Sequence, residues 1–142
     1  MNSMYENIQL LIVDDELDFL DTITERMELR GFVVTKAPNG EAALEAVKTK
    51  KYDIAILDLK MPGLDGKKVL EILKREHTNI EVVILTADGS SDVAEETSKL
   101  GAFCVITKPI DIEKLISVII LAYESRLKKD SGFLKQDFEI VS

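Results

Sequence analysis

The sequence has little of the residue types that hold secreted proteins together or bind metal through soft ligands. Its 142 residues contain a single cysteine, Cys104, and a single histidine, His77. One cysteine cannot form an internal disulfide, and because it lies in an apolar run we expect a buried, inert thiol. His77 stands in a polar stretch with no second histidine nearby, so we expect a surface residue and no histidine metal site.

Long hydrophobic runs are also missing. The longest apolar stretch, at 115–122, is far shorter than the ~20 residues needed to span a bilayer. The first apolar run is preceded by Glu6 rather than by a basic residue and ends at Asp14 and Asp15, which argues against a secretory signal. We therefore expect a cytoplasmic protein without membrane contact.

The chain has fewer basic than acidic residues. The chain has 18 Lys and Arg against 26 Asp and Glu, a net charge of −8. A surface that follows a phosphate backbone needs clustered Lys and Arg, so we expect no direct nucleic-acid binding by this domain. The chain is 46% hydrophobic and 31% charged, an ordinary balance for one globular domain.

Strands and helices are predicted to alternate along the chain. Short apolar runs rich in Val and Ile are typical of strands covered on both faces, and they fall at 8–13, 32–34, 54–57, 82–85 and 103–106. The segments between these runs have helical spacing. Strict alternation with short loops implies right-handed crossovers, and therefore a parallel sheet with helices on both faces.

The ends of the helices carry recognisable signals. Gly31 and Gly101 stand where a helix would end in a left-handed residue, and Asn39 can cap the second helix. Asp92 and Glu95 have the spacing of a capping box for the fourth helix. The helical pattern stops after 129, so we expect a domain at 1–129, followed at 130–142 by a C-terminal tail or the start of a linker.

Polar side chains follow four of the five predicted strands. Asp14 and Asp15 follow the first, Asp58 follows the third, and Thr86 and Lys108 follow the fourth and fifth. Ligands of an open parallel sheet bind at the carboxyl ends of its strands, where the strand order reverses. With the order 2-1-3-4-5, the three carboxylates would converge there, and Thr86 and Lys108 would approach from the side.

Such a cluster favours phosphoryl-transfer chemistry. Converging carboxylates repel one another unless a cation lies among them, and hard oxygen ligands favour Mg²⁺, with Mn²⁺ as an alternative. The metal, the Lys108 ammonium and the Thr86 hydroxyl could stabilise an incoming phosphoryl group, and Asp58 would be the nucleophile.

Each of these residues also has a purely structural interpretation. Asp14 and Asp15 could be helix caps, Asp58 a turn former, Thr86 a satisfied strand-end hydroxyl and Lys108 a solvated surface lysine. The placement of all five at the same predicted edge of the sheet favours the functional interpretation.

The ordered motifs resemble those of receiver domains of two-component response regulators. They are IVDDE at 12–16, ILDLKMPGLDG at 56–66, LTA at 85–87 and TKP at 107–109. The resemblance extends over roughly 8–122. It implies a flavodoxin-like, doubly wound (βα)5 three-layer sandwich with a parallel five-stranded sheet of order 2-1-3-4-5.

The resemblance also implies a metal site. In that family, residues at the positions of Asp15 and Asp58 ligate Mg²⁺ directly, together with the backbone carbonyl at the position of Lys60. The residue equivalent to Asp14 acts mainly through a bound water.

The phosphoryl site follows from the same resemblance. Asp58 would be the phosphoacceptor, with Thr86 and Lys108 as its catalytic partners. Both partners would hold phosphoryl oxygens, helped by the backbone N–H groups of Leu59 and Ala87. The peptide bond between Lys108 and Pro109 would be cis.

A signalling function is implied as well. The phosphodonor would be a sensor histidine kinase, a histidine phosphotransfer protein or an acyl phosphate. The domain would catalyse its own phosphorylation and slow dephosphorylation without being an enzyme for other substrates. The face formed by the fourth helix, fifth strand and fifth helix would bind a downstream protein or a second copy in a phosphorylation-dependent dimer. Alternatives are a phosphorelay intermediate and the N-terminal regulatory fragment of a larger transcription or enzyme regulator.

The chain departs from the family at one position. Val105 stands where receivers usually have an aromatic residue that turns inward on phosphorylation, and a stiff, short valine cannot do this. Phe103 would lie on the same face if the strand is regular. Lys60 and Asp88 could form an ion pair at the mouth of the site, although two unpaired surface charges are the simpler interpretation.

Three other classes of function fit the sequence less well. Phosphatases of the haloacid-dehalogenase type have an Asp-x-Asp motif after the first strand, whereas Asp14 and Asp15 are adjacent. A flavin or nucleotide binder would need a glycine-rich or hydroxyl-rich phosphate loop, which is missing. A pure interaction domain would have no need of the five site residues.

Overall fold

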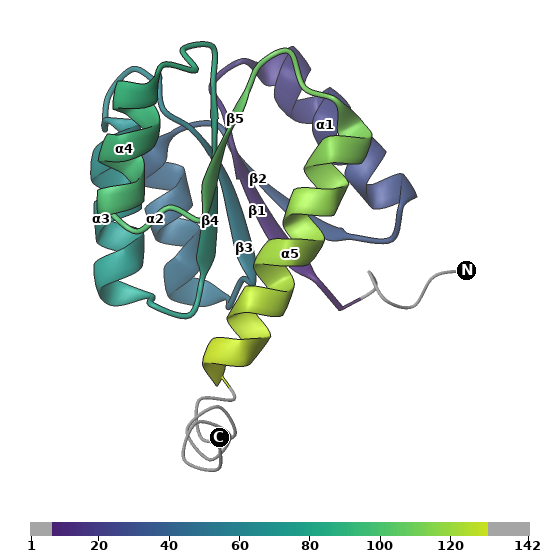
Figure 1. Cartoon of the computed structure of the whole chain (residues 1–142). Helices are drawn as coiled ribbons and strands as arrows, with labels where there is room; N and C mark the ends of the chain where they lie inside the picture. The colour runs from purple at the N-terminus through teal and green to yellow at the C-terminus, as the bar shows by residue number, and fades with distance from the viewer. Residues whose placement is uncertain (1–6, 131–142) are drawn as a thin grey trace.

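The structure is a computed structural model that describes residues 7–130. Its five strands form one parallel sheet in the order β2-β1-β3-β4-β5 (Figure 1). The strands are β1 (Gln9–Val13), β2 (Val33–Ala37), β3 (Ile54–Asp58), β4 (Glu81–Thr86) and β5 (Cys104–Thr107).

Five helices cover both faces of this sheet. They are α1 (Leu17–Leu29), α2 (Gly40–Thr49), α3 (Gly66–Glu76), α4 (Ser91–Lys99) and α5 (Ile112–Asp130). Helices α1 and α5 lie on one face, and α2, α3 and α4 lie on the other (Figure 1). The predicted three-layer (βα)5 sandwich and its strand order are therefore confirmed. No helix within residues 7–130 has the length and apolar character needed to cross a membrane.

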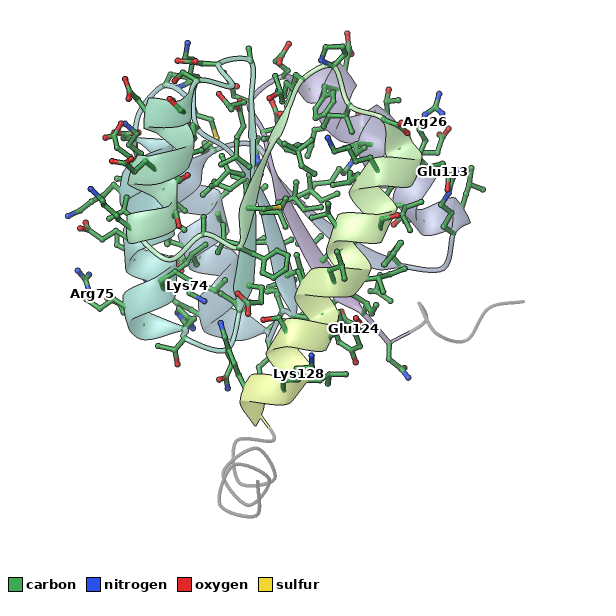
Figure 2. The ribbon with its side chains drawn as sticks, viewed as in Figure 1. Arg26, Lys74, Arg75, Glu113, Glu124 and Lys128 are labelled. Atoms are coloured by element: carbon green, nitrogen blue, oxygen red, sulfur yellow. The ribbon has the colours of Figure 1, made fainter. Side chains whose placement is uncertain are left out.

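Two apolar clusters, one on each face, hold the layers together. On the α1/α5 face, Ile12 and Ile56 pack with Leu20 and Ile119. On the opposite face, the intervening strand residues pack with residues of α2 and α3, as Leu57 does with Leu70. Charged side chains such as Arg75, Glu113 and Lys128 lie on the outer surface (Figure 2). Because β1 and β3 are buried on both faces, their carboxyl ends are fixed in place.

The predicted helix signals at two positions are confirmed. Gly31 has a φ of 98° after the end of α1, a conformation that costs glycine little. The Asn39 side chain accepts a hydrogen bond of 2.8 Å from the Ala42 N–H and so caps α2.

The predicted capping box of α4 is wrong. Ser90 is the N-cap, and its hydroxyl accepts a hydrogen bond of 3.3 Å from the Val93 N–H. Asp92 and Glu95 lie inside the helix. The helix begins earlier because Ser90, in the loop after β4, has the extended backbone conformation that an N-cap needs. Asp92 contributes only negative charge in the first turn.

Strand β2 also differs from its prediction at 32–34. It continues to Ala37 because Thr35 and Lys36 pair with Leu11 and Ile12 of β1. Backbone pairing at the edge of the sheet does not require apolar side chains. The apolar run at 32–34 therefore marks only part of the strand.

Strand β5 begins one residue later than predicted, and this changes the face on which Phe103 lies. Phe103 packs against the α1/α5 cluster, whereas Val105 packs against the cluster on the opposite face. The expectation that the two residues share a face is wrong because Phe103 precedes the regular strand. Cys104 is half-buried rather than buried, and this burial raises the pKa of its thiol.

Buried Glu81 anchors the end of α5 to the sheet. Its carboxylate accepts a hydrogen bond of 3.0 Å from the Ser125 hydroxyl and forms an ion pair of 2.7 Å with Lys129. Helix α5 ends at Asp130, and the rest of the predicted tail at 130–142 lies outside the described residues.

We predict that Gly66→Ala destabilises the fold and disturbs the end of β3. A Cβ atom at Gly66 would lie 2.6 Å from the Leu59 Cα and 2.8 Å from the Asp58 carbonyl oxygen, and backbone atoms cannot move aside cheaply. Urea unfolding should show a loss of about 2–3 kcal/mol. Gly40→Ala is the matched control: its nearest contact is a methyl group of Val69, so the loss should be smaller. Equal losses would contradict this explanation.

Candidate functional site

Three carboxylates meet at the carboxyl edge of the sheet, as predicted. Asp14 and Asp15 follow β1, Asp58 ends β3, and one ligand oxygen from each lies within 4.8 Å of the others. Asp14 is fully buried and Asp58 is 5% exposed, whereas Asp15 is partly exposed. The cluster is therefore open to solvent through Asp15 while two of its acids are held in the protein.

Strand register brings these acids together. Val13 pairs with Leu57 in adjacent strands, so the residues that follow them, Asp14 and Asp58, leave the sheet side by side. The Asp14 N–H donates to the Ala37 carbonyl of β2, 3.1 Å away, which holds the start of the loop. The site thus lies where β1 has neighbours on both sides and the chain order reverses.

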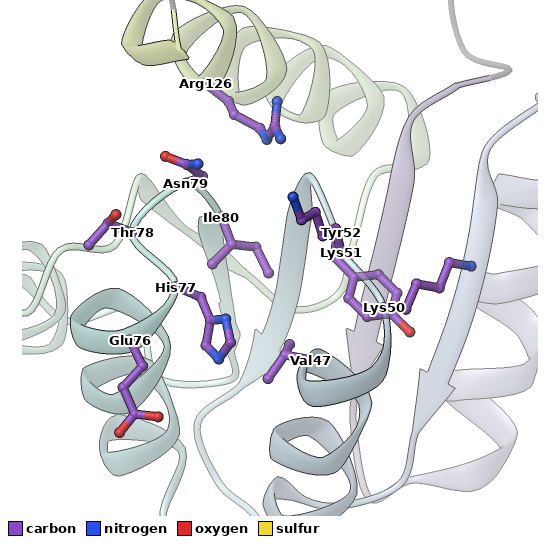
Figure 3. A pocket seen from close by; sticks show the side chains of 10 residues that line it. All are labelled: Val47, Lys50, Lys51, Tyr52, Glu76, His77, Thr78, Asn79, Ile80 and Arg126. Carbon is purple, nitrogen blue, oxygen red and sulfur yellow. The ribbon is translucent and has the colours of Figure 1, made fainter.

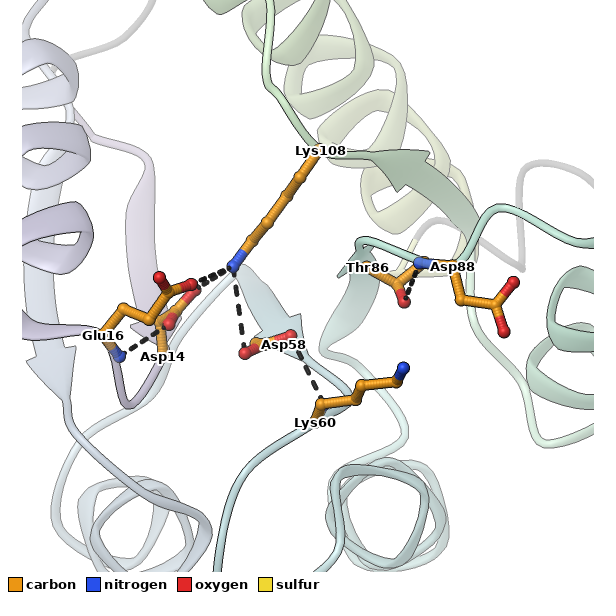
Figure 4. A network of polar contacts seen from close by, with 7 residues as sticks. All are labelled: Asp14, Glu16, Asp58, Lys60, Thr86, Asp88 and Lys108. Atoms are coloured by element: carbon orange, nitrogen blue, oxygen red, sulfur yellow. Dashed lines mark hydrogen bonds and ion pairs between the residues drawn. The ribbon is translucent and has the colours of Figure 1, made fainter.

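The Lys108 ammonium reaches this cluster from the end of β5. It donates to Asp14 Oδ2 at 2.9 Å and to Glu16 Oε1 at 3.1 Å, and it lies 3.9 Å from Asp58 Oδ2 (Figure 4). The predicted cis bond to Pro109 is confirmed. Glu16 was not among the predicted site residues, although its position directly after the acid pair could have indicated a role.

Burial and like charge raise the pKa of Asp58. Desolvation is the largest cause, the nearby Asp14 charge adds to it, and Lys108 opposes it, so the pKa reaches about 6. Burial lowers the pKa of Lys108, but the hydrogen bonds to Asp14 and Glu16 and the charge of Asp58 outweigh burial and raise it. One ammonium thus compensates the carboxylates only in part.

The cluster fits a hard divalent cation. It offers carboxylate oxygens from Asp14, Asp15 and Asp58, each within 4.8 Å of the others. Such ligands suit Mg²⁺ or Mn²⁺ and do not suit a soft metal. The backbone carbonyl of Lys60, two residues after Asp58, is the predicted further ligand.

Thr86 lies beside this cluster at the end of β4. It is 1% exposed, and its hydroxyl oxygen accepts a hydrogen bond of 3.0 Å from the Asp88 N–H. Ala87, the next residue, is exposed. The hydroxyl is therefore already engaged with the loop that leads to α4.

Two backbone N–H groups near Asp58 already have acceptors. The Leu59 N–H, a predicted phosphoryl ligand, donates to the Leu85 carbonyl at a long 3.4 Å, and the Lys60 N–H donates to Asp58 Oδ1 at 3.3 Å. The Lys60 side chain and Asp88 do not form an ion pair, although both are within the described residues (Figure 4). The simpler interpretation, two separate surface charges, holds for this pair.

A cavity of about 490 Å³ lies far from this chemistry. Its lining includes Tyr52 and Ile80, which precede β3 and β4, so it opens at the opposite edge of the sheet (Figure 3). Its other polar groups include Lys51, Arg126 and His77, which is partly buried rather than fully on the surface. None of the predicted site residues lines this cavity.

The match to a family model decides the assignment. Residues 10–120 match the model described as the response regulator receiver domain, and this range contains the three acids, Thr86 and Lys108. The chain belongs to the response regulator receiver domain family. Its function is accordingly that of a receiver, a signalling domain of two-component systems.

Several relatives of this receiver are of similar length. Sporulation initiation phosphotransferase F of Bacillus subtilis is 37% identical over 77% of this chain and 88% of its own. The Francisella response regulator 1452 receiver domain is 34% identical, with a TM-score of 0.79 over 84% of this chain and 98% of its own. The Borrelia burgdorferi CheY, solved as a CheX-CheY-BeF3-Mg²⁺ complex, is 28% identical, with a TM-score of 0.78 over 82% of this chain and 89% of that chain.

Other curated relatives of this receiver are much longer. They include proteins named as transcriptional or nitrogen regulatory proteins, and this chain spans between 23% and 29% of their length. Receivers thus occur both as proteins of about this size and as parts of larger regulators.

We predict that Asp58→Asn stabilises the metal-free receiver above pH 6. A carboxyl group whose pKa is raised by folding binds more protons in the folded chain, so stability falls as the pH rises from 3.8 to about 6. Ionised Asp58 should therefore cost on the order of 2 kcal/mol, which the amide variant avoids. Thermal unfolding at several pH values in chelator measures this, and the gain should shrink towards pH 4.

Divalent ions provide the control for that measurement. Adding Mg²⁺ should raise the melting temperature of the natural chain at pH 7.5 and raise that of Asp58→Asn less, since the ion binds the folded cluster. If Asp58→Asn stabilises the chain equally at pH 4 and at pH 7.5, the electrostatic explanation is contradicted.

Proposed function

We propose that this receiver accepts a phosphoryl group on Asp58 in a Mg²⁺-dependent reaction. The observation that carries the proposal is the cluster of Asp14, Asp15 and Asp58 oxygens within 4.8 Å, with the Lys108 ammonium 3.9 Å from Asp58. A carboxylate oxygen of Asp58 would attack phosphorus, an aspartyl phosphate bond would form, and the bond from phosphorus to the donor would break. The donor would leave with its electron pair.

The chain's own residues would stabilise the transferred group. Lys108 would leave Asp14 for a phosphoryl oxygen, and the Thr86 hydroxyl would donate to another oxygen after giving up its contact with the Asp88 N–H. The N–H groups of Leu59 and Ala87 are further candidate donors. Mg²⁺, held by the three acids and the Lys60 carbonyl, would neutralise negative charge on the group in transfer.

A groove beside the site supports phosphotransfer from a protein donor. It has a volume of about 290 Å³, and its lining includes Phe19 and Ile23 of α1 and Ile110 and Ile112 beyond β5. Ile110 follows Lys108 by two residues, so an apolar surface docked here would lie next to the phosphoacceptor. We propose a histidine kinase or a histidine phosphotransfer protein as that donor, and a cytoplasmic location, where one unpaired cysteine stays reduced.

The output of the receiver follows one of two routes. The relative named as a phosphotransferase is of similar length, which favours a phosphorelay intermediate acting through protein contact. The longer relatives favour the alternative, in which residues 1–129 are the receiver and 130–142 begin a linker or tail in a larger regulator. In either case the partner surface would be α4, β5 and α5, which could also join two phosphorylated copies.

A chain of capping hydrogen bonds could carry the signal from Thr86 to α4. Thr86 accepts from the Asp88 N–H at 3.0 Å, the Asp88 carboxylate accepts from the Ser90 N–H at 3.0 Å, and the Ser90 hydroxyl accepts from the Val93 N–H. If Thr86 turns to the phosphoryl group, the first bond is lost and the loop is released from β4. This path requires no aromatic ring at Val105.

We predict that acetyl phosphate with Mg²⁺ adds one phosphoryl group to the natural chain and none to Asp58→Ala. Asp58 ends β3 and lies 3.9 Å from the Lys108 ammonium, so its replacement removes the proposed acceptor. Intact-protein mass spectrometry measures the addition. Asp18→Ala, which removes an exposed acid of α1, should leave phosphorylation unchanged. Phosphate on Asp58→Ala would reject the proposal.

We predict that beryllofluoride with Mg²⁺ shifts the amide resonances from Ala87 to Val93, in addition to those beside Asp58. Ser90→Ala should reduce the shifts in α4 while leaving those at Leu59 and Lys60, and should cost about 1 kcal/mol of stability as a lost cap. Ser98→Ala, an exposed serine in the same helix, is the control. Shifts confined to the metal ligands would contradict the capping route.

A further inference from the structure

Lys108 has two partners that do not belong to the carboxylate cluster. Its ammonium lies 4.5 Å from the centre of the Phe19 ring and 3.1 Å from Glu16 Oε1. Phe19 lies in the first turn of α1 and Glu16 is the N-cap residue of that helix, whereas the three acids of the cluster lie at the ends of β1 and β3. The side chain of Lys108 is only 16% exposed, so these contacts replace much of its water.

These partners matter because Asp14 would interact with two cations, the Lys108 ammonium and the proposed divalent ion. In the structure Asp14 is the closest partner of Lys108, at 2.9 Å, whereas Asp58 lies at 3.9 Å. The oxygens of Asp14 are also among those that fit a divalent ion. When that ion is bound, Asp14 attracts the Lys108 ammonium less strongly. Repulsion between the divalent cation and the ammonium also disfavours the present position of the ammonium.

The Phe19 ring is suited to hold the ammonium under those conditions. An aromatic face attracts a cation through its quadrupole and carries no net charge that a metal ion would compete for. Glu16 attracts the ammonium more directly, but its side chain is 67% exposed, so water and salt weaken that contact. The ring is therefore the partner that persists after metal binding.

We propose that Phe19 is a positioning residue that holds the Lys108 ammonium within reach of the phosphoryl group. The inference rests on the proposed phosphotransfer to Asp58 and assigns to Phe19 a part in it. Phe19 also lines the groove between α1 and the segment after β5 and packs against the α1/α5 cluster. A small-molecule phosphodonor removes any docking contribution, and a leucine replacement retains apolar packing.

The first experiment measures position without any phosphodonor. A proton above an aromatic face is shielded, so the ε-methylene protons of Lys108 should resonate upfield of the other lysines in the metal-free full chain. This upfield shift should persist in Phe19→Tyr and disappear in Phe19→Leu. It should also persist when Mg²⁺ is added. An ordinary shift in the natural chain, with or without Mg²⁺, would overturn the proposal.

The second experiment measures the rate of phosphorylation by acetyl phosphate at saturating Mg²⁺. Phe19→Leu should be about threefold to tenfold slower than the natural chain, which is the range expected for loss of a cation–π contact. Phe19→Tyr, which keeps the ring face, should restore the rate. Phe103→Leu is the matched control, because Phe103 packs against the same apolar cluster but is not a ring partner of Lys108.

The outcomes separate this inference from the function on which it rests. If the natural chain takes up no phosphoryl group on Asp58, the proposed function fails, whatever the lysine resonances show. If it does so, and Phe19→Leu matches the natural rate or slows no more than Phe103→Leu, the positioning role of Phe19 is rejected. Amide spectra of each variant show whether the fold is intact before rates are compared.

Discussion

Crowded negative charge at one edge of the sheet is the constraint on which the rest of the structure depends. Asp14 and Asp58 are almost completely buried beside Asp15, and the Lys108 ammonium compensates them only in part. Burial is the largest cause of the rise in the pKa of Asp58 to about 6, and the charge of Asp14 adds to it. A site in this condition gains from binding positive charge, which supports the proposed binding of a divalent cation.

The fold supplies the rigidity that this crowding requires. Strands β1 and β3 are buried on both faces, so their carboxyl ends cannot move apart to relieve the repulsion. The loop after β4 is held more lightly, by hydrogen bonds that the side-chain oxygens of Thr86, Asp88 and Ser90 accept from backbone N–H groups. A receiver that must keep its acids fixed and still change shape therefore has its rigid and its adjustable parts on neighbouring strands.

Several patterns that depend on near neighbours were predicted correctly, whereas two details that depend on the path of the chain between elements were not. The β1 and β3 runs and the Asn39 cap are local features, and the structure confirms them. The Asp92 capping box was wrong because the path of the preceding loop selects Ser90. The side of the sheet taken by Phe103 depends on where β5 starts, which periodicity fixes only to within a residue or two.

The sequence by itself determined the family, the strand order through its ordered motifs, and the acids that end β1 and β3. Only the tertiary structure decided the partners of Lys108. Phe19 and Glu16 are about ninety residues away along the chain, and no spacing rule connects them to the lysine. They meet because α1 and the segment that follows β5 line the same groove, and such contacts arise from packing rather than from local sequence.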